Sequence, residues 1–376
     1  MLDFSSALYL GFRHPYRALG SWDSLTTGRP AALYEPPLVR KLEGTLAELV
    51  GLERAVLGSS SLHLFWDLFG QLSKDWIVFI DAEAYPIAQW GAERAAGRGV
   101  RVERFAHHDA AGLRRQLRQT GGRRPLVVTD GFCPLCGKPA PLQAYLEVLR
   151  PQGGLLLLDD TQALGVLGRE PNPRRPYGRG GGGSLAYSNI AGDVTGDDIL
   201  LVASLAKGFG VPLAVLSGSK HTLAVFRARS DTRVHCSPPS NVALLAAKRA
   251  LELNRHVGER LRSGLLARVR YLRGRLNALG IRAAGGLFPA QNLGSVYGVD
   301  APMLYRLLLR CGVRAVLQRG HTTSPRLGVL VNARHTRAEL DTLIDALNPA
   351  FGRGSRPPLY PFKEVYDERQ TPIRAG

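Results

Sequence analysis

The chain has 376 residues, enough for two domains, and 45% hydrophobic with 21% charged residues is the composition of a globular protein. It carries 49 basic and 31 acidic residues, a formal net charge of +18, which points to an acidic or phosphate-bearing partner. Only seven of the basic residues are lysine, and the arginines are spread along the chain, so nucleic acid is not predicted as a partner. Apolar runs such as GGLLLLDD break off at acids, which excludes a predicted membrane span.

The N-terminus and the cysteines favour a cytoplasmic location. The first residues, MLDFSSALYLGFRHP, carry an acid and no basic cluster, unlike a signal peptide. Four cysteines in a chain of this length fit a reducing compartment. Cys133 and Cys136 have the Cys-x-x-Cys spacing, but no second cysteine pair completes a zinc site, so no metal site is predicted. A redox role for the pair is left open.

Helix and strand patterns alternate from residue 38 to residue 204. Leucines at helical spacing predict a helix over 38–57, and a second helix follows the small-residue turn at 58–61. Five apolar runs predict strands with helical segments between the first four: WIVFID, VRVERF, PLVVTDG, LLLLDD and ILLVAS. Near-continuous apolar strands that alternate with helices indicate a mainly parallel sheet covered by helices on both faces.

Four charged side chains fall at or just beyond the carboxyl ends of these strands: Asp81, Asp130, Asp159 and Lys207. Ligands of such sheets bind at this edge, so we expect the four to share one site. Lys207 stands alone among small and apolar residues in LVASLAKGFG. A desolvated lysine is available as a free amine that can form a Schiff base, and the competing interpretation is a side chain that extends to solvent.

The glycine-rich stretch 177–187, YGRGGGGSLAY, is interpreted as a surface loop. After residue 240 the sequence pattern changes, and residues 241–280 are interpreted as one long helix. Short strand patterns and the helix ELDTLIDAL then predict a smaller α+β domain. The predicted division is an N-terminal segment over 1–45, a large domain over 46–235, a small C-terminal domain over 236–350, and an extended tail over 351–376.

Lys207 and Asp159 suggest a particular cofactor. Asp159 ends the most apolar strand, and a carboxylate there can hold the proton on a heterocyclic nitrogen. Gly208 and Gly210 beside Lys207 let a ring approach the backbone. A Schiff-base lysine with an acid partner for the pyridinium is what pyridoxal phosphate requires.

Four segments carry a resemblance to a known family: DDTQALGVLG, SLAKGFG, CSPPSNVALLAA and SPRLGVLVNARHT. With LDFSSALYLG at the start, their order resembles that of the α-oxoamine synthases, a branch of the fold-type I pyridoxal-phosphate enzymes. The resemblance implies an α/β transferase that condenses an amino acid with an acyl thioester, on coenzyme A or an acyl-carrier protein, and releases carbon dioxide. It also implies a homodimer.

The resemblance further assigns roles by position. Lys207 is implied to form the Schiff base, Asp159 to pair with the pyridine nitrogen, and Asp160 to face the opposite side of its strand. Gln162 and Tyr85 fall where the family has histidines, the first near the phenolic oxygen and the second stacked on the ring. The residues implied to bind the phosphate and the substrate are Ser60, Ser61 and Ser204 for the phosphate, and Arg326 with Arg29 for the substrate.

Departures from the family pattern leave other activities open. Ala7 stands where the family has an asparagine near the substrate carboxylate, and Gln162 cannot titrate as a histidine does. The alternative is therefore an aminotransferase or lyase of a biosynthetic pathway on the same fold. A third hypothesis is a basic binding protein that kept the fold and lost the chemistry.

Overall fold

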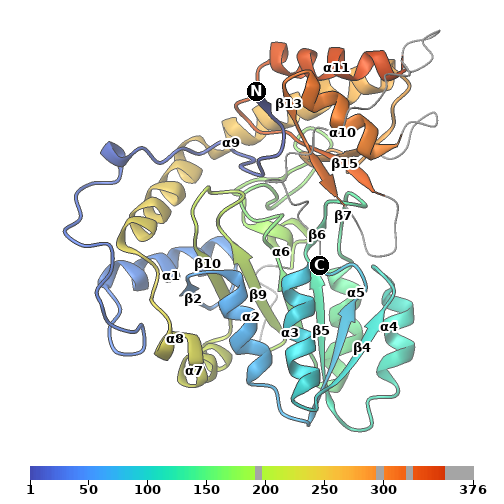
Figure 1. The fold of residues 1–376 in the computed structure, drawn as a ribbon. Coiled ribbons are helices and arrows are strands. Elements are labelled where there is room, and N and C mark those ends of the chain that lie inside the picture. Colours follow the sequence, from blue (N-terminus) through green and yellow to red (C-terminus); the bar gives the residue numbers. More distant parts are fainter. Residues whose placement is uncertain (191–196, 294–299, 319–324, 352–376) are drawn as a thin grey trace. The chain divides into compact units, whose positions relative to one another are not determined.

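The structure is a computed structural model, and it describes residues 1–190, 197–293, 300–318 and 325–351 (Figure 1). The chain divides into two compact units. Unit 2 comprises residues 10–133 and 139–262, and unit 1 comprises residues 1–9, 134–138 and 263–376. Each unit is described separately below.

Unit 2 is built on a seven-stranded sheet with the order β2-β10-β9-β8-β5-β3-β4. Strands β9, β8, β5, β3 and β4 pair in parallel, whereas β10 is antiparallel to both of its neighbours. The strands are β2 (Arg54–Gly58), β3 (Trp76–Asp81), β4 (Arg101–Phe105), β5 (Arg124–Asp130), β8 (Leu155–Asp159), β9 (Ile199–Ser204) and β10 (Ala214–Gly218). All five strands predicted from apolar runs are present, which confirms the mainly parallel sheet.

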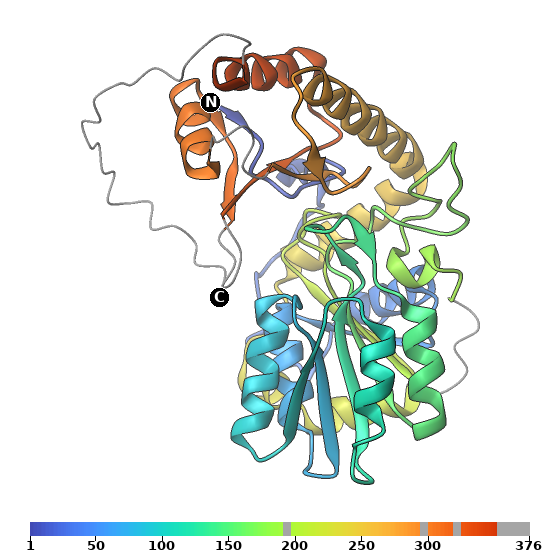
Figure 2. The same cartoon turned by 90° about the vertical axis from the view of Figure 1, so that its right-hand side faces the viewer.

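Helices cover both faces of this sheet (Figure 2). Helices α2 (Ser61–Gly70), α3 (Pro86–Gly97), α7 (Lys220–Arg229) and α8 (Asp231–His235) pack on one face, where Phe65, Phe69 and Phe226 join alternate strand residues in the core. Helices α1 (Pro37–Val50), α4 (Ala110–Leu117), α5 (Leu142–Leu149) and α6 (Gly183–Tyr187) complete the covering. Because successive strand residues point to opposite faces, both sets of apolar side chains are buried, as a doubly covered sheet requires.

The helix predicted over residues 38–57 is shorter in the structure. Helix α1 ends at Val50, where Gly51 adopts a left-handed conformation with φ 78° and caps the helix. Residues 54–58 then form edge strand β2, which pairs with β10. Neither β2 nor β10 was predicted. The apolar residues of β2 continue the helical spacing of α1, and those of β10 directly follow the turn that carries Lys207.

The glycine-rich stretch at 177–187 is not the surface loop that its composition suggested. Tyr177 is buried, and Arg169 forms a bridge with Arg179 and Leu164 with Gly182. Gly178 and Gly181 have positive φ angles, and a Cβ at Gly178 would lie 2.0 Å from the Gly168 carbonyl oxygen. The glycines therefore permit close backbone packing in an ordered segment.

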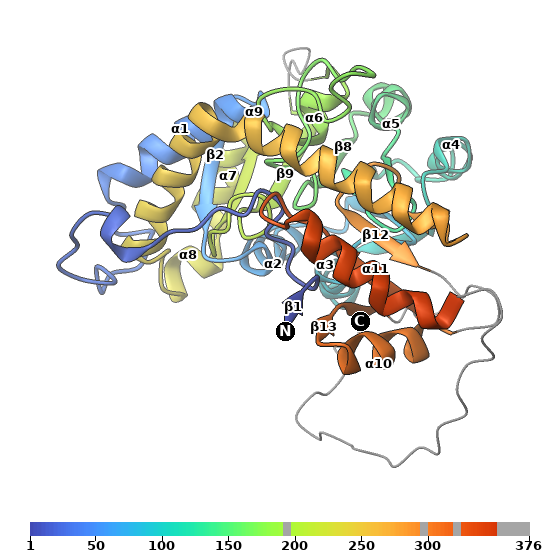
Figure 3. The ribbon, with the colours of Figure 1, turned by 90° about the horizontal axis from the view of Figure 1, so that it is seen from above.

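Unit 1 contains a four-stranded antiparallel sheet with the order β11-β12-β15-β14 and a short parallel pair, β1-β13. These strands are β1 (Leu2–Asp3), β11 (Ala283–Ala284), β12 (Ala290–Leu293), β13 (Val313–Arg314), β14 (Val316–Gln318) and β15 (Arg326–Leu330). Helices α10 (Ala301–Arg310) and α11 (Arg337–Phe351) pack against each other (Figure 3). This architecture confirms the smaller α+β domain.

The boundaries of the two units differ from those of the predicted domains. Strand β1 pairs with β13, which joins the first residues to unit 1. Helix α9 (Asn241–Ala278) belongs to unit 2 up to Arg262 and to unit 1 from Ser263. The tail predicted over 351–376 lies outside the described residues, apart from Phe351 at the end of α11. The remaining short elements are 3-10 turns at Tyr16–Ala18 and Arg150–Gln152, and the hairpin β6 (Phe132–Cys133) with β7 (Lys138–Pro139). Within the described ranges, no helix is both long and apolar enough to span a membrane.

Candidate active site

The carboxyl ends of four neighbouring parallel strands form one edge of the sheet in unit 2. The last residues of β3, β5 and β8 are Asp81, Asp130 and Asp159, and the last residue of β9 is Ser204. Asp130 and Asp159 are register partners on adjacent strands. Lys207 follows three residues after Ser204, in the turn that leads to β10. The sheet thus places Asp130, Asp159 and Lys207 near one another, whereas the carboxylate of Asp81 bonds His107 and His108 instead.

Asp159 is buried and held in a fixed orientation by the turn that follows it. Its side chain is 6% exposed, and its Oδ1 accepts a hydrogen bond from the Thr161 backbone N–H at 3.0 Å. The Thr161 hydroxyl accepts one from the Ser204 N–H at 3.0 Å, which ties the ends of β8 and β9 together. Burial raises the pKa of Asp159, while the Thr161 hydrogen bonds and the Lys207 charge oppose that rise.

Asp130 is a second carboxylate at the same place, and sequence analysis did not assign it a role. Its Oδ1 accepts a hydrogen bond from the Tyr85 backbone N–H at 3.1 Å. Burial and the neighbouring Asp159 raise the pKa of Asp130 well above its usual value. Asp159 is buried and Asp130 is partly buried, and two neighbouring acids whose charges repel each other favour a cationic group between or beside them.

Lys207 is half-buried at this edge rather than extended into solvent. Its Nζ lies 5.3 Å from the centroid of the Tyr85 ring. Burial lowers the pKa of Lys207, and the charges of Asp159 and Asp130 act in the opposite direction. The fraction of uncharged amine is therefore larger than for a surface lysine, and that form attacks an aldehyde.

The turn that carries Lys207 packs closely on the turn after β8. A Cβ at Gly208 would lie 2.3 Å from the Leu164 carbonyl oxygen, so only glycine fits there. Gln162 is half-buried in that second turn, next to Thr161. Its position in the chain places it at the same edge as Asp159.

Tyr85 precedes the first turn of α3, where Pro86 begins the helix. The side chain is 47% exposed in the single chain. Burial of part of the ring, together with the charges of Asp159 and Asp130, raises the pKa of Tyr85. The ring therefore lies beside both acids and the lysine, with an open side.

The N-terminus of α2 follows β2 and presents the first backbone amides of the helix. Ser60 is the N-cap residue, and its Oγ accepts a hydrogen bond from the His63 N–H at 3.4 Å and lies 2.7 Å from His63 Nδ1. Ser61 begins the helix. Helix α2 packs against β9, the strand that ends at Ser204. Such a helix start favours anions, so capping and phosphate binding are compatible here.

The two predicted substrate-binding arginines lie in different parts of the chain. Arg326 belongs to unit 1, where it begins β15 and pairs with Gln318 of β14. Arg29 is exposed in unit 2, and its guanidinium lies 5.7 Å from the centroid of the Tyr34 ring.

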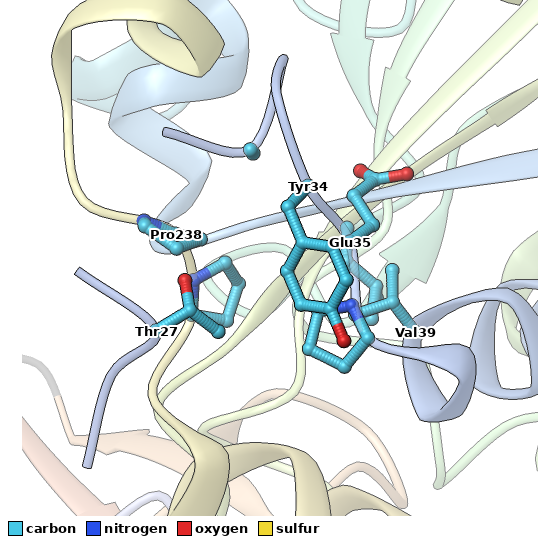
Figure 4. A pocket seen from close by; sticks show the side chains of 9 residues that line it. Thr27, Tyr34, Glu35, Val39 and Pro238 are labelled. Atoms are coloured by element: carbon cyan, nitrogen blue, oxygen red, sulfur yellow. The ribbon is translucent and has the colours of Figure 1, made fainter. Parts of the chain in front are cut away.

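A small pocket adjoins Tyr34 (Figure 4). Thr27, Tyr34, Val39 and Pro238 line it, and its interior of about 10 Å³ holds little more than one water molecule. It contains neither Lys207 nor Asp159. The pocket is therefore too small, and made of the wrong residues, for an organic cofactor.

The residues at the sheet edge fit pyridoxal phosphate on three counts. Asp159 is a buried carboxylate with a raised pKa that a ring N–H would pair with. Lys207 is an amine with a lowered pKa across from it. A helix start with serine at the cap is the usual place for a phosphate. Sequence reasoning placed Asp130 at this edge without a role and missed Thr161, because the Thr161 hydrogen bond depends on which strands are neighbours.

Comparison with known proteins agrees with this geometry. The aminotransferase class I and II family matches residues 3–347. The 8-amino-7-oxononanoate synthase of Alkalilimnicola ehrlichii is 30% identical over 316 residues, covering 83% of this chain and 76% of that protein. The protein of the same name from Sodalis glossinidius is 30% identical over 364 residues, covering 93% and 88%.

Solved structures show the same fold. The chain resembles the serine palmitoyltransferase of Sphingomonas wittichii with a TM-score of 0.80 at 19% identity, covering 93% of this chain and 88% of that one. It resembles the 8-amino-7-oxononanoate synthase of Francisella tularensis with a TM-score of 0.71 at 16% identity, covering 93% and 97%.

The fold and the lysine–carboxylate edge define a fold-type I pyridoxal-phosphate-dependent transferase. Within that class, the chain belongs to the aminotransferase class I and II family, in its α-oxoamine synthase branch. Both the predicted family and the predicted cofactor are thereby confirmed.

Proposed function

We propose that this chain condenses an amino acid with an acyl thioester, releases carbon dioxide and the free thiol, and produces an α-aminoketone. The observation that carries the proposal is that Lys207 and Asp159 lie at one sheet edge and influence each other's charge, in a chain of the α-oxoamine synthase branch. Named relatives in this branch make 8-amino-7-oxononanoate, and we expect this chain to perform a reaction of the same type.

Lys207 and Asp159 have complementary roles in this proposal. Bound pyridoxal phosphate supplies the electron sink for the carbanion at the substrate α-carbon. The Lys207 amine would hold the cofactor at its aldehyde carbon, would be released when the substrate amine takes its place, and would then move the proton at the substrate α-carbon. Asp159, oriented by Thr161, keeps a proton on the pyridine nitrogen, and its own burial strengthens that charged hydrogen bond.

The other residues hold the cofactor in place. Ser60, Ser61 and the amides at the start of α2 bind the phosphate, with the Ser204 hydroxyl as a further donor. Tyr85 stacks on the ring, a role supported by its contact with Lys207 Nζ. Gln162 donates a hydrogen bond to the phenolic oxygen without changing its own charge.

The substrates are assigned from the resemblance and from the charge of the chain. Arg326 binds the amino-acid carboxylate through its bidentate fork, and Arg29 is a second, weaker candidate for substrate contact. A net charge of +18 suits coenzyme A or an acidic acyl-carrier protein as the thioester carrier. We further propose a homodimer that acts in the cytoplasm.

The experiment that tests this function measures thiol release. Purified protein with pyridoxal phosphate is screened against pairs of amino acids and acyl thioesters, with thiol followed by a chromogenic disulfide and products by mass spectrometry. We expect a product whose mass equals that of the amino acid plus the acyl group, minus carbon dioxide and the one hydrogen that leaves with the thiol. Keto-acid formation without thiol release would contradict the proposal and support transamination.

Matched lysine variants show whether the reaction belongs to this site. Lys207→Ala is expected to abolish product formation, whereas Lys220→Ala, at an exposed helix start, is expected to leave it unchanged. Equal loss in both variants would contradict the assignment of Lys207.

A further inference from the structure

A buried arginine of helix α9 lies beside the turn after β8 and has no part in the chemistry proposed above. Arg262 is 2% exposed. A charged guanidinium is costly to bury unless its hydrogen bonds compensate for the lost water. Replacing a buried charge by an apolar side chain of similar size is often neutral or stabilising. Stability alone therefore does not explain an arginine at this position, and its specific contacts deserve a functional explanation.

The Arg262 guanidinium joins α9 to the turn after β8. Its Nη1 donates hydrogen bonds to the Gly165 carbonyl oxygen at 2.9 Å and to Asn254 Oδ1 at 2.7 Å. Its Nη2 donates to Glu259 Oε1 at 2.7 Å. The planar fork of arginine suits such contacts in several directions, which the single nitrogen of lysine cannot reproduce. We call Arg262, Asn254 and Glu259 the Arg262 clamp.

The other two members of the Arg262 clamp hold the glycine-rich segment. Asn254 Nδ2 donates to the Gly180 carbonyl oxygen at 2.9 Å, and Glu259 Oε1 accepts from the Gly180 N–H at 2.7 Å. The Gly165 N–H in turn donates to the Gly181 carbonyl oxygen at 2.8 Å. Three side chains of one helix thus fix two segments that are also bonded to each other.

Gly258 makes room for the Arg262 clamp on α9. Asn254, Gly258 and Arg262 follow one another at intervals of four residues, so they lie on one face of the helix. A Cβ at Gly258 would lie 2.7 Å from Arg262 Nη2 and 2.7 Å from Asn254 Oδ1. Glycine inside a helix costs about 1 kcal/mol relative to alanine. The helix is therefore weakened at the one position where a larger residue would displace the clamp.

The turn held by the Arg262 clamp contacts both principal residues of the active site. Gly208 directly follows Lys207, and a Cβ at Gly208 would lie 3.2 Å from the Gly165 Cα. The same turn begins with Thr161, whose N–H donates to Asp159 Oδ1 at 3.0 Å. A displacement of this turn would therefore move the Lys207 amine and the Asp159 carboxylate relative to each other.

We propose that Arg262 is a positioning residue for Lys207. With Asn254 and Glu259 it fixes the turn after β8, and this turn fixes the separation between the Lys207 amine and the Asp159 carboxylate. Arg262 acts through the backbone at Gly165 rather than on the cofactor itself. The inference rests on the role proposed above for Lys207.

Hydrogen–deuterium exchange of the full cofactor-free chain tests the clamp directly. Arg262→Ala removes three hydrogen bonds, and we expect exchange about tenfold faster or more in peptides that cover residues 161–168 and 205–211. Arg262→Lys keeps the cation without the fork, so its exchange should lie between those of wild type and Arg262→Ala. If Arg262→Ala does not fold, Arg262→Lys against wild type decides. Arg227→Ala, which removes an ion-paired arginine of α7, is the matched control and should leave both peptides unchanged.

Cofactor capture supplies a second readout, which a purely structural role would not change. Pyridoxal phosphate is mixed with each cofactor-free protein, and the visible absorbance of the bound cofactor is followed in time. Because a small displacement of a reacting group slows bond formation strongly, we expect Arg262→Lys to capture the cofactor about 10- to 100-fold more slowly than wild type. Arg227→Ala is expected to lower the midpoint of thermal unfolding and to keep the wild-type rate of capture.

Two results would overturn the inference. One is exchange at the wild-type rate over residues 161–168 and 205–211 in the folded Arg262 variants. The other is cofactor capture that is unchanged in these variants, or slowed to the same extent in Arg227→Ala, since that would mark the role of Arg262 as general stabilisation. Wild type that does not bond the cofactor at Lys207 is a different result, because it contradicts the proposed function, and the exchange measurement then still decides whether Arg262 fixes the two turns.

Discussion

Asp160 shows how the two acids at the end of β8 differ although they are neighbours in the chain. Its side chain is fully buried and accepts hydrogen bonds from the Ser184 N–H. Burial raises the pKa of Asp160 to about 7, with the Asp159 charge adding to the rise. The family resemblance predicted a structural role for this residue, and its contacts agree with that role.

The Asp160 pKa predicts a pH dependence of stability. The folded chain holds the proton up to about pH 7 and the unfolded chain releases it near 4, so the free energy of unfolding falls as pH rises through this window. At about 1.4 kcal/mol per pKa unit, the loss from this group reaches up to about 4 kcal/mol. We expect Asp160→Asn, which resembles the protonated acid, to flatten the slope in denaturant titrations at pH 5 and pH 8.

The contribution of Asp160 is isolated by subtracting the pH dependence of the free energy of unfolding of Asp160→Asn from that of wild type. The other buried acids titrate in both, so their contribution cancels. An unchanged slope in Asp160→Asn would show that Asp160 is ionised in the folded state throughout this range.

The site residues differ in how far sequence alone could predict them. Lys207 and Asp159 were predictable, because the carboxyl ends of parallel strands lie at the same edge of the sheet, so charged residues that follow such strands come together there. Asp130 was placed at the same edge for the same reason, whereas its position directly beside Asp159 was not predictable, because it depends on β5 and β8 being register partners.

At the scale of single elements, Ser60 caps helix α2 and is also proposed to bind the cofactor phosphate. These two roles can be separated by substitution. Ser60→Ala is expected to lower the free energy of unfolding by about 1 kcal/mol. Ser60→Asp keeps a good cap, so the stability of the cofactor-free form should stay near that of wild type.

The charge in Ser60→Asp distinguishes the roles. An added carboxylate beside the phosphate is expected to weaken pyridoxal phosphate binding about tenfold or more, measured by absorbance titration. Asp109→Ser, the corresponding change at the cap of α4, should alter cofactor affinity little. Unchanged affinity in Ser60→Asp would remove Ser60 from the phosphate site.

Thr161 links two elements, since its hydroxyl accepts a hydrogen bond from the Ser204 N–H and so joins the ends of β8 and β9. Thr161→Ala leaves that N–H without its acceptor, and we expect a loss of about 1–3 kcal/mol in stability. Thr161→Ser should restore most of it, because the hydroxyl returns. Thermal unfolding of the three proteins measures the effect, and equal midpoints would show that the link is dispensable.

Strands whose residues continue a neighbouring pattern were harder to predict than separate apolar runs. The five predicted strands, including edge strand β4, are separate apolar runs, whereas the residues of β2 continue the helical spacing of α1 and were predicted as part of that helix. Gly51 was the available signal, because a left-handed glycine after an apolar helical run marks a helix end. Gly178, Gly181 and Gly183 were misinterpreted for the opposite reason, since their positive φ angles serve close packing rather than freedom of motion.

At the scale of the whole molecule, the single chain leaves Tyr85 47% exposed beside Lys207. A homodimer would cover this open side if the partner subunit completes the site, as the family resemblance implies. We expect light scattering of the purified protein to give twice the chain mass of 40.8 kDa. A monomer that is fully active at low concentration would contradict this part of the account.

The central claim is that the Lys207 amine bonds to pyridoxal phosphate, and one measurement tests it directly. The protein is incubated with the cofactor, reduced with borohydride, digested and mapped by mass spectrometry. The account predicts a phosphopyridoxyl group on the peptide that contains Lys207 and on no other of the seven lysines. A label on another lysine, or no label after reduction, would contradict it.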